Sequence, residues 1–264
     1  MVPSTLSRKA SEATPLIAEY SSRFRLVETS AIWIFAALFA ALAARGYFAP
    51  FSVSAVQTAL IVFLGALSAD LVSGLVHWAA DTWGNQTWPI VGPTLIRSFR
   101  EHHVDAKAIT RHDFVEANGA TALVLLPVIL GVHLFMPGSS SAWTHLQSQA
   151  SLFALSLTFF VFMTNQIHKW AHVDLPPSFV RLLQSLRLIL PRGHHQVHHR
   201  GRHTSCYCIT TGWLNPILDR IQFFRLSEKL IQSISTLRAR EDDLKLIGLA
   251  AQSRSRVSSD THPS

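Results

Sequence analysis

Four apolar windows of the 264-residue chain are each long enough to cross a lipid bilayer. A membrane-spanning helix needs about 20 predominantly apolar residues. The windows are Ala31–Phe48, Val53–Trp78, Ala120–Met136 and Leu152–Trp170. Charged residues make up only 15% of the chain, whereas soluble globular proteins carry about 25%. The sequence therefore predicts an all-α integral membrane protein with four transmembrane helices, the third of them kinked or tilted by Pro127.

Basic residues are distributed unevenly between these windows. Of the 23 Lys and Arg residues, 14 lie from Lys169 onward, whereas the segment 137–150 contains none. Segments rich in Lys and Arg stay in the cytoplasm. We therefore expect a multi-pass protein of a bacterial inner membrane or of the endoplasmic reticulum, with both termini and the loop 81–116 in the cytoplasm. The net charge of +7 then favours anionic lipid headgroups over nucleic acid as the partner of the basic surface.

Composition divides the chain into a cytoplasmic N-terminal tail (1–29), a membrane-embedded domain (30–226) and a charged, cytoplasmic C-terminal tail (227–264). Two stretches of the domain have apolar residues at helical spacing and basic residues between them. This pattern predicts helices that lie in the membrane interface. They are Phe179–Leu190, which Pro191-Arg192-Gly193 should end, and Asn215–Leu226.

We expect neither a cleavable signal peptide nor a cysteine-based scaffold. The polar stretch before Ala31 is longer and more acidic than the start of a typical signal peptide. The two cysteines, Cys206 and Cys208, are too few for a disulfide scaffold or a four-thiolate iron–sulfur cluster. We expect both to be packing residues.

Histidines recur where the predicted cytoplasmic ends of the apolar windows lie. Neutral imidazole is a good ligand for iron, zinc and copper. The predicted metal ligands are His77, Asp81, His102, His103, His112, His168, His172, His194, His195, His198 and His199. Three further side chains are expected to support them: Asp70 by orienting an imidazole, Asn165 by binding a metal through water, and His203. His133, His145 and His262 lie at the opposite face or in the tail, and we predict no role for them.

Helical spacing brings several of these side chains to a common face. Residues four apart, such as His77 and Asp81, lie on the same side of a helix. The neighbours His102 and His103 point about 100° apart on a helix, so they can serve two metals or bracket one. The last group, at 194–199, lies among arginines, and its alternative interpretation is a protonated basic patch. Lysine and arginine serve that purpose better than histidine.

The number of imidazoles indicates two metal ions. Structural zinc takes about four ligands and catalytic zinc about three plus water, so this set exceeds the needs of one site. The His-Glu-x-x-His helix of a metalloprotease is absent from the sequence, and a metal transporter would place its ligands near the middle of its spans. Two iron ions (Fe2+/Fe3+) fit best, because iron can activate O2 and remove hydrogen from an unactivated alkyl carbon. We expect no catalytic residue beyond the ligands.

Six motifs resemble those of the Kua-type lipid desaturases. They are His77–Gly84, Phe99–Asp105, Ala108–Gly119, Gln166–His172, Gly193–His199 and Tyr207–Asp219. The resemblance covers about residues 70–226 and leaves out both tails. One branch of this family, the plasmanylethanolamine desaturases, makes the vinyl ether bond of plasmalogens. A plant branch places a trans double bond in an acyl chain of phosphatidylglycerol. The amino-acid sequences of the motifs are closer to those of the first branch.

The resemblance implies a di-iron, O2-dependent enzyme that converts a 1-O-alkyl ether phospholipid (plasmanylethanolamine) to the 1-alkenyl vinyl ether. Its partners would be a membrane phospholipid, O2 and an external electron donor of the cytochrome b5 or ferredoxin type, because the sequence contains no flavin or cluster motif. Arg97, Arg100 and Arg111 are candidates to contact the lipid headgroup. Two alternatives stay open: a desaturase or hydroxylase of phospholipid acyl chains, and a non-catalytic membrane protein that binds metal.

Overall fold

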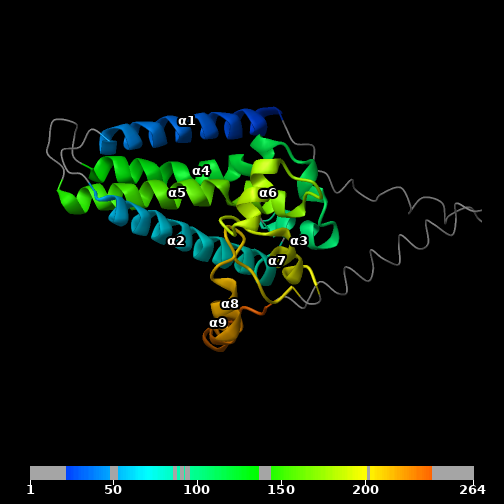
Figure 1. The fold of residues 1–264 in the computed structure, drawn as a ribbon. Helices are drawn as coiled ribbons and strands as arrows, with labels where there is room; N and C mark the ends of the chain where they lie inside the picture. Colours follow the sequence, from blue (N-terminus) through cyan, green and yellow to red (C-terminus); the bar gives the residue numbers. More distant parts are fainter. Residues whose placement is uncertain are drawn as a thin grey trace, which may run out of the picture.

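The computed structural model describes residues 22–47, 53–85, 88–89, 92, 96–136, 144–200 and 203–239, and these contain helices and irregular segments without any strand. Four long helices run side by side (Figure 1). They are α1 (Ser22–Tyr47), α2 (Ala55–Thr82), α4 (Phe114–Phe135) and α5 (His145–His172). Each is long and apolar enough to cross a membrane. The prediction of an all-α protein with four membrane-spanning helices is confirmed.

Three of the helices, α1, α4 and α5, start earlier than the apolar windows indicated. α4 begins at Phe114 because Asp113 caps it: the Asp113 carboxylate accepts the N–H groups of Val115 and Glu116, and the Glu116 side chain accepts the Asp113 N–H. A hydropathy window detects only apolar residues and therefore misses such polar first turns. α4 also continues through Pro127 without ending. Its first turns therefore extend the span toward the histidine-bearing end of the molecule.

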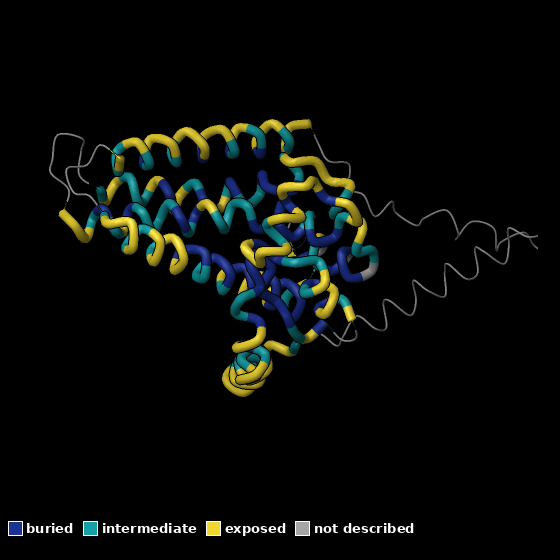
Figure 2. Tube along the Cα trace, viewed as in Figure 1, coloured by how far each residue is buried: buried dark blue, intermediate teal, exposed yellow. Residues whose placement is uncertain are grey.

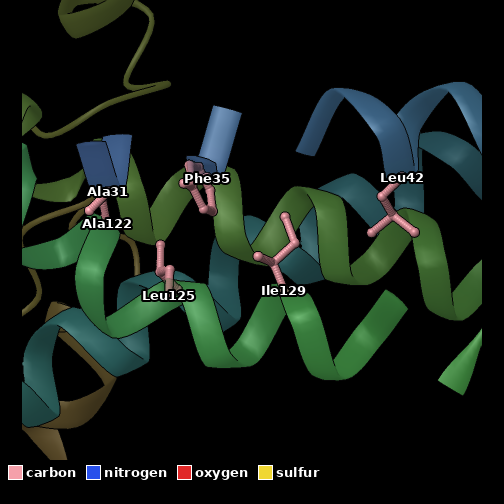
Figure 3. Packing of buried hydrophobic residues seen from close by; sticks show 6 residues of the cluster. All are labelled: Ala31, Phe35, Leu42, Ala122, Leu125 and Ile129. Carbon is pink, nitrogen blue, oxygen red and sulfur yellow. The ribbon is translucent and has the colours of Figure 1, made fainter. Parts of the chain in front are cut away.

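The four spans pack as two pairs. Buried side chains of α1 and α4 pack together in one apolar cluster (Figure 3); they are Ala31, Phe35, Leu42, Ala122, Leu125 and Ile129. α2 approaches α5 closely at Gly65, where an added Cβ would lie 2.4 Å from Ser156 Oγ. Small residues permit such close approach of helices in lipid. Much of the outer surface of the spans is exposed (Figure 2). The exposed residues include apolar ones such as Trp33, at 72% exposure, as expected of a multi-pass membrane protein.

Short helices gather at the end of this unit where α2 and α5 terminate (Figure 1). They are α3 (Arg97–Val104), the 3-10 helix η2 (Ala108–Arg111), α6 (Ser178–Ser185), α7 (Arg192–His198), α8 (Asn215–Arg220) and α9 (Phe223–Ile234). α9 lies crosswise to the spans, since Figure 2 views it nearly along its axis while the spans run across the picture. Its exposed Leu226, Leu230 and Ile234 suit a helix in the membrane interface.

Two predicted elements need correction. The helix expected at Phe179–Leu190 ends at Ser185, because the chain turns at Arg187, which has a φ of 56°. The predicted break at Pro191-Arg192-Gly193 is shorter than expected. Pro191 is the N-cap of α7, and Arg192 and Gly193 lie in the first turn of that helix. The stretch Asn215–Leu226 is divided at Gln222, with φ of 53°, into α8 and α9.

Several predictions fall partly or wholly outside the described residues. These concern most of the 1–29 tail and the C-terminal part from 240 onward with His262. At the two predicted domain boundaries the chain is helical: α1 starts at Ser22, and α9 continues to Ile234.

Candidate metal centre

Side chains from α2, α3, α5 and α7 converge where the short helices meet the spans. They form two groups, and within each group the potential ligand atoms lie within 4.8 Å of one another. The first, called here the five-histidine group, consists of His102, His168, His172, His195 and His199. The second, the Asp81 group, consists of His77, Asp81, His103 and His198. All of these residues except the half-buried His199 are buried.

Helix geometry distributes the histidines between the groups. The neighbours His102 and His103 on α3 point to different groups, as a rotation of about 100° per residue allows. On α7, His195 faces the five-histidine group and His198 faces the Asp81 group. α5 contributes only to the first group and α2 only to the second. The sequence left open whether the adjacent histidines serve two metals or one, and the structure favours two.

A carboxylate lies at the centre of the Asp81 group. Its Oδ2 atom is 3.3 Å from His77 Nε2, 3.4 Å from His103 Nε2 and 3.6 Å from His198 Nε2. The Nε2 atoms of His103 and His198 are 3.1 Å apart. Three imidazole nitrogens and one carboxylate oxygen thus face a common point.

The outer nitrogens of two of these rings face backbone carbonyls. His77 Nδ1 lies 3.0 Å from the Tyr207 carbonyl oxygen, and His198 Nδ1 lies 2.7 Å from that of Ser205. A carbonyl can only accept, so Nδ1 carries the proton in both neutral rings. The lone pair of each ring is therefore on Nε2, the atom that faces Asp81.

Nitrogen atoms crowd together in the five-histidine group. His195 Nε2 lies 2.8 Å from His168 Nε2 and 3.0 Å from His199 Nε2, and His172 Nε2 lies 3.3 Å from His168 Nε2. A ring nitrogen cannot both donate and accept, so hydrogen bonds serve this chain of contacts poorly. Nitrogens bound to one ion at about 2.1 Å, with perpendicular bonds, would be about 3.0 Å apart. The spacing fits ligands of a single cation.

Burial leaves this region suited to a metal. Neither ring nitrogen of His102 has a hydrogen-bond partner within the described residues, although the side chain is buried. Burial lowers the pKa of His102, His195 and His198 well below the ordinary value of 6.5, and neighbouring histidines lower it further. The rings are thus neutral at pH 7, which is the form that binds metal. Each of the two groups therefore fits one metal ion.

Two predicted ligands lie outside both groups. His112 is exposed after η2, and its carbonyl accepts a hydrogen bond from Lys169 Nζ. His194 is half-buried, and its Nε2 lies 3.0 Å from the Asn215 side-chain nitrogen. Sequence position did not separate these residues from their histidine neighbours, because the direction of each ring depends on the local fold.

The expected supporting residues also differ in placement. His203 is buried beside the Asp81 group, where its ring stacks on that of His103 with centroids 4.2 Å apart. Asn165 is not in either group, and its Nδ2 donates to Thr121 Oγ1 at 3.1 Å. Of the two, His203 alone contacts the site.

The sequence predicted that Asp70 orients an imidazole, but in the structure its carboxylate bonds to backbone N–H groups. Its fully buried carboxylate accepts backbone N–H groups of Thr210, Thr211, Gly212 and Leu214, at 2.7 to 3.2 Å. A non-helical backbone beside a span needs such internal partners. The sequence analysis included this segment only as part of the motif Tyr207–Asp219 and missed the role of its backbone, because backbone donors and acceptors carry no side-chain signal.

The three arginines expected at the headgroup differ as well. Arg100 is buried, and its Nη2 donates to the carbonyls of Trp83 and Gly84, both at 3.0 Å. It therefore stabilises the C-terminal end of α2 and is not a headgroup contact. Arg111 is exposed and pairs with Asp105 at 2.8 Å. The side chain of Arg97 lies outside the described residues.

Comparison with known proteins adds to this geometry. The lipid desaturase domain family matches residues 66–242. The chain is 44% identical over 233 residues to a plasmanylethanolamine desaturase of Myxococcus xanthus, covering 88% of this chain and 81% of that protein. It is 50% identical over 186 residues to plasmanylethanolamine desaturase 1 of Mus musculus, covering 70% and 68%. Chloroplastic fatty acid desaturase 4 of Arabidopsis thaliana is 33% identical over 175 residues, covering 65% and 51%. No solved structure matches.

Proposed function

The chain belongs to the lipid desaturase domain family, and on that premise we propose that it converts 1-O-alkyl ether phospholipids to 1-alkenyl vinyl ethers. It is a multi-pass membrane enzyme that desaturates a lipid with O2. Two relatives named as plasmanylethanolamine desaturases match most of this chain and most of their own length. Together with the paired buried histidine groups, that similarity carries the proposal.

The proposed reaction balances without any group from the protein being consumed. The alkyl chain loses one hydrogen from the first carbon beside the ether oxygen and one from the second. One O2, two electrons and two protons are used, and two waters are formed with the double bond. The ether oxygen makes the first carbon the easier one to oxidise.

Iron is the proposed metal in both groups. The five imidazoles would hold one ion, and His77, His103, His198 and Asp81 would hold the other. When bound, the two irons would supply the activation of O2 and the removal of hydrogen from an unreactive alkyl carbon, which amino-acid side chains cannot perform. Burial of the ligands keeps the imidazoles neutral and keeps bulk water away from the reacting carbons.

Orientation and partners follow from the charge distribution. We place both termini and the metal centre on the cytoplasmic side of a bacterial inner membrane or the endoplasmic reticulum, in line with the positive-inside rule. An external protein of the cytochrome b5 or ferredoxin type would deliver the electrons. Arg111, which is exposed, is a candidate contact for the lipid phosphate; Arg97 is a second candidate on sequence grounds.

Acyl-chain desaturation is the second candidate function. The similarity to fatty acid desaturase 4 of Arabidopsis thaliana favours it. Lipid analysis distinguishes the two, because vinyl ethers release aldehydes in acid and unsaturated fatty esters do not. The third interpretation, a metal-binding protein without catalysis, predicts no change in any lipid.

Expression in a cell that lacks plasmalogens and is fed an alkylglycerol tests the proposal. Mass spectrometry should find ether lipids lighter by two hydrogens whose alkenyl chain is released by acid. His198→Ala should abolish this product while the protein is still inserted in the membrane. His145→Ala, at the opposite end of α5, is the matched control and should keep full activity. New double bonds only in ester-linked chains would reject the ether substrate.

A further inference from the structure

An irregular segment, residues 205–214, contacts the Asp81 group through its backbone. The carbonyl of Ser205 accepts from His198 Nδ1 at 2.7 Å, and the carbonyl of Tyr207 accepts from His77 Nδ1 at 3.0 Å. These two bonds determine which nitrogen of each ring carries the proton. They also set the direction in which each Nε2 lone pair points. The placement of this segment therefore controls two of the three imidazoles in the group.

Side chains of α2 hold one side of the segment. Asp70 accepts four of its N–H groups, and Ser73 Oγ accepts the Ile209 N–H at 3.0 Å. Hydrogen bonds to an ionised carboxylate are stronger than those between neutral groups. Asp70 and Ser73 lie on the same helix as His77. α2 thus supplies both a ligand candidate and the anchor for the carbonyl that orients it.

Side chains of α8 hold the other side. Asn215 accepts the Cys208 N–H at 2.8 Å through Oδ1 and donates to the Cys208 carbonyl at 2.9 Å through Nδ2. The Asp219 carboxylate accepts the Cys206 N–H at 3.2 and 3.3 Å. The backbone on both sides of Tyr207 is therefore fixed by side chains, in a part of the chain that has no regular secondary structure.

Within the described residues, no backbone carbonyl of the segment 205–214 hydrogen-bonds to a ring of the five-histidine group. The members of that group come from three helices and the residue after α7, and they contact one another through ring atoms. The outer nitrogen of His195, Nδ1, has no hydrogen-bond partner within the described residues, although it is buried. The segment 205–214 thus hydrogen-bonds to rings of one group and not of the other, while its hydrogen-bonding contact with α5 is the pair of hydroxyl groups of Thr164 and Thr210, 2.7 Å apart.

We propose that Asp70 and Asn215 are positioning residues that act through the segment 205–214 to orient His77 and His198 for a metal ion in the Asp81 group, and that they do not control the five-histidine group. This inference rests on the proposed metal binding by the two groups. A role in folding alone would affect both groups alike. Selective loss of one metal site is the signature that separates positioning from general stability.

The test measures metal binding by purified full-length protein in detergent. Apoprotein is titrated anaerobically with Fe2+, and separately with Co2+, and the metal content per chain is measured. Wild type should bind two ions. Asp70→Asn removes the charge and turns one acceptor into a donor that opposes an N–H group. It should weaken one of the two binding events by about 10- to 100-fold and leave the other unchanged.

A second variant assigns that event to a group. His195→Ala removes the central ligand of the five-histidine group and should leave one binding event, that of the Asp81 group. Adding Asp70→Asn to His195→Ala should weaken this remaining event. If instead the single variant Asp70→Asn weakens both events equally, the positioning role is rejected.

Asn215→Ala provides an independent route if Asp70→Asn does not fold. It removes both bonds to Cys208 and the contact with His194, which belongs to neither group, and it should produce the same selective loss. Asn118→Ala is its matched control, because Asn118 is also a fully buried asparagine with a bond to a backbone carbonyl, that of Phe114, but it does not touch the segment. Two unchanged affinities in folded Asn215→Ala would overturn the inference.

Failure of the proposed function gives a different result. Wild type that binds two ions but forms no vinyl ether would reject the substrate and leave the positioning role intact. Wild type that binds no metal would reject both the metal centre and the inference that rests on it.

Discussion

The two histidine groups adjoin each other but are built in different ways. The five-histidine group draws its rings from α3, α5, α7 and His199, the residue after α7, and includes no carboxylate. The Asp81 group has only three rings, and its carboxylate lies within 3.6 Å of all of them. Backbone carbonyls of an irregular segment orient two of those rings. One group depends on helix packing and a surplus of donors, whereas the other depends on a carboxylate and a fixed segment.

That difference predicts unequal tolerance to change. Loss of a peripheral ring such as His172, unlike loss of the central His195, whose Nε2 lies within 3.0 Å of two other rings, leaves four imidazoles, which still match the about four ligands of a closed site. Loss of Asp81 leaves three rings and removes the only negative charge in the second group. The Asp81 group should therefore be the more sensitive of the two.

Asp81→Ala tests this with the largest expected effect. The ion bound by the Asp81 group should be lost, with an affinity decrease of more than about 100-fold, beyond what supporting residues cause. Vinyl ether formation should fall below detection. Metal content per chain and lipid mass spectrometry measure the two effects. Asp174→Ala, which removes an exposed carboxylate paired with Lys107 and Arg192, is the control; an Asp81→Ala protein that keeps two ions would remove the basis of the comparison.

His172→Ala tests the other group. Four imidazoles remain, so we expect the ion to be retained with an affinity lowered by about 10-fold and activity to be reduced but measurable. His145→Ala on the same helix should change neither. Complete loss of one ion from His172→Ala would show that the five-histidine group has no surplus of donors.

Much of the fold and part of the site could be predicted because both depend on regular helices. Hydropathy identified the four spans, and four-residue spacing placed His168 beside His172. The rotation between adjacent helical residues explains why His102 and His103 belong to different groups. The structure brings together the nine candidate ligands of the two groups. Metal binding by these residues stays a prediction.

Irregular segments account for what could not be predicted. His112 and His203 both lie in charged, polar sequence, yet only His203 packs on the site. Neither residue lies within a helix, so helical spacing could not predict which of the two would reach the site. Asp70 was expected to face a ring, but it bonds to N–H groups at 210–214, far away in sequence. The backbone conformation of such a segment is determined by tertiary contacts, which local sequence patterns do not report.

Gly74→Ala probes the segment from the helix side, with a smaller expected effect. A Cβ at Gly74 would lie 2.6 Å from Cys208 Sγ and 3.3 Å from Cys208 N, so the segment must shift. Overpacking of this kind costs about 1–3 kcal/mol of stability. We expect the affinity of the Asp81 group to fall by at most about 10-fold and that of the five-histidine group to stay unchanged.

The control for Gly74→Ala is Gly131→Ala on α4, because nothing lies within 4 Å of a Cβ there. It should leave metal binding unchanged and raise stability slightly, by up to about 1 kcal/mol, since alanine is the better helix former. Thermal unfolding and metal titration of both variants measure the difference. Equal effects at the two positions would show that the segment tolerates displacement.

Mild acid should produce the smallest effect, and here the two groups should behave alike. Burial lowers the pKa of His102 and His195 in the five-histidine group and of His198 in the Asp81 group well below 6.5. Protons then compete poorly with metal for these rings, so metal content should change less than about two-fold between pH 7.5 and pH 6.

In the unfolded chain the same rings take up protons below about pH 6.5. The free energy of unfolding of the apoprotein should therefore be highest above that pH and decrease as the pH falls further, because the unfolded state binds more protons. Metal content and apoprotein stability measured across this range check both signs, and loss of one ion near pH 6.5 would show that one group is less protected from water than its burial indicates.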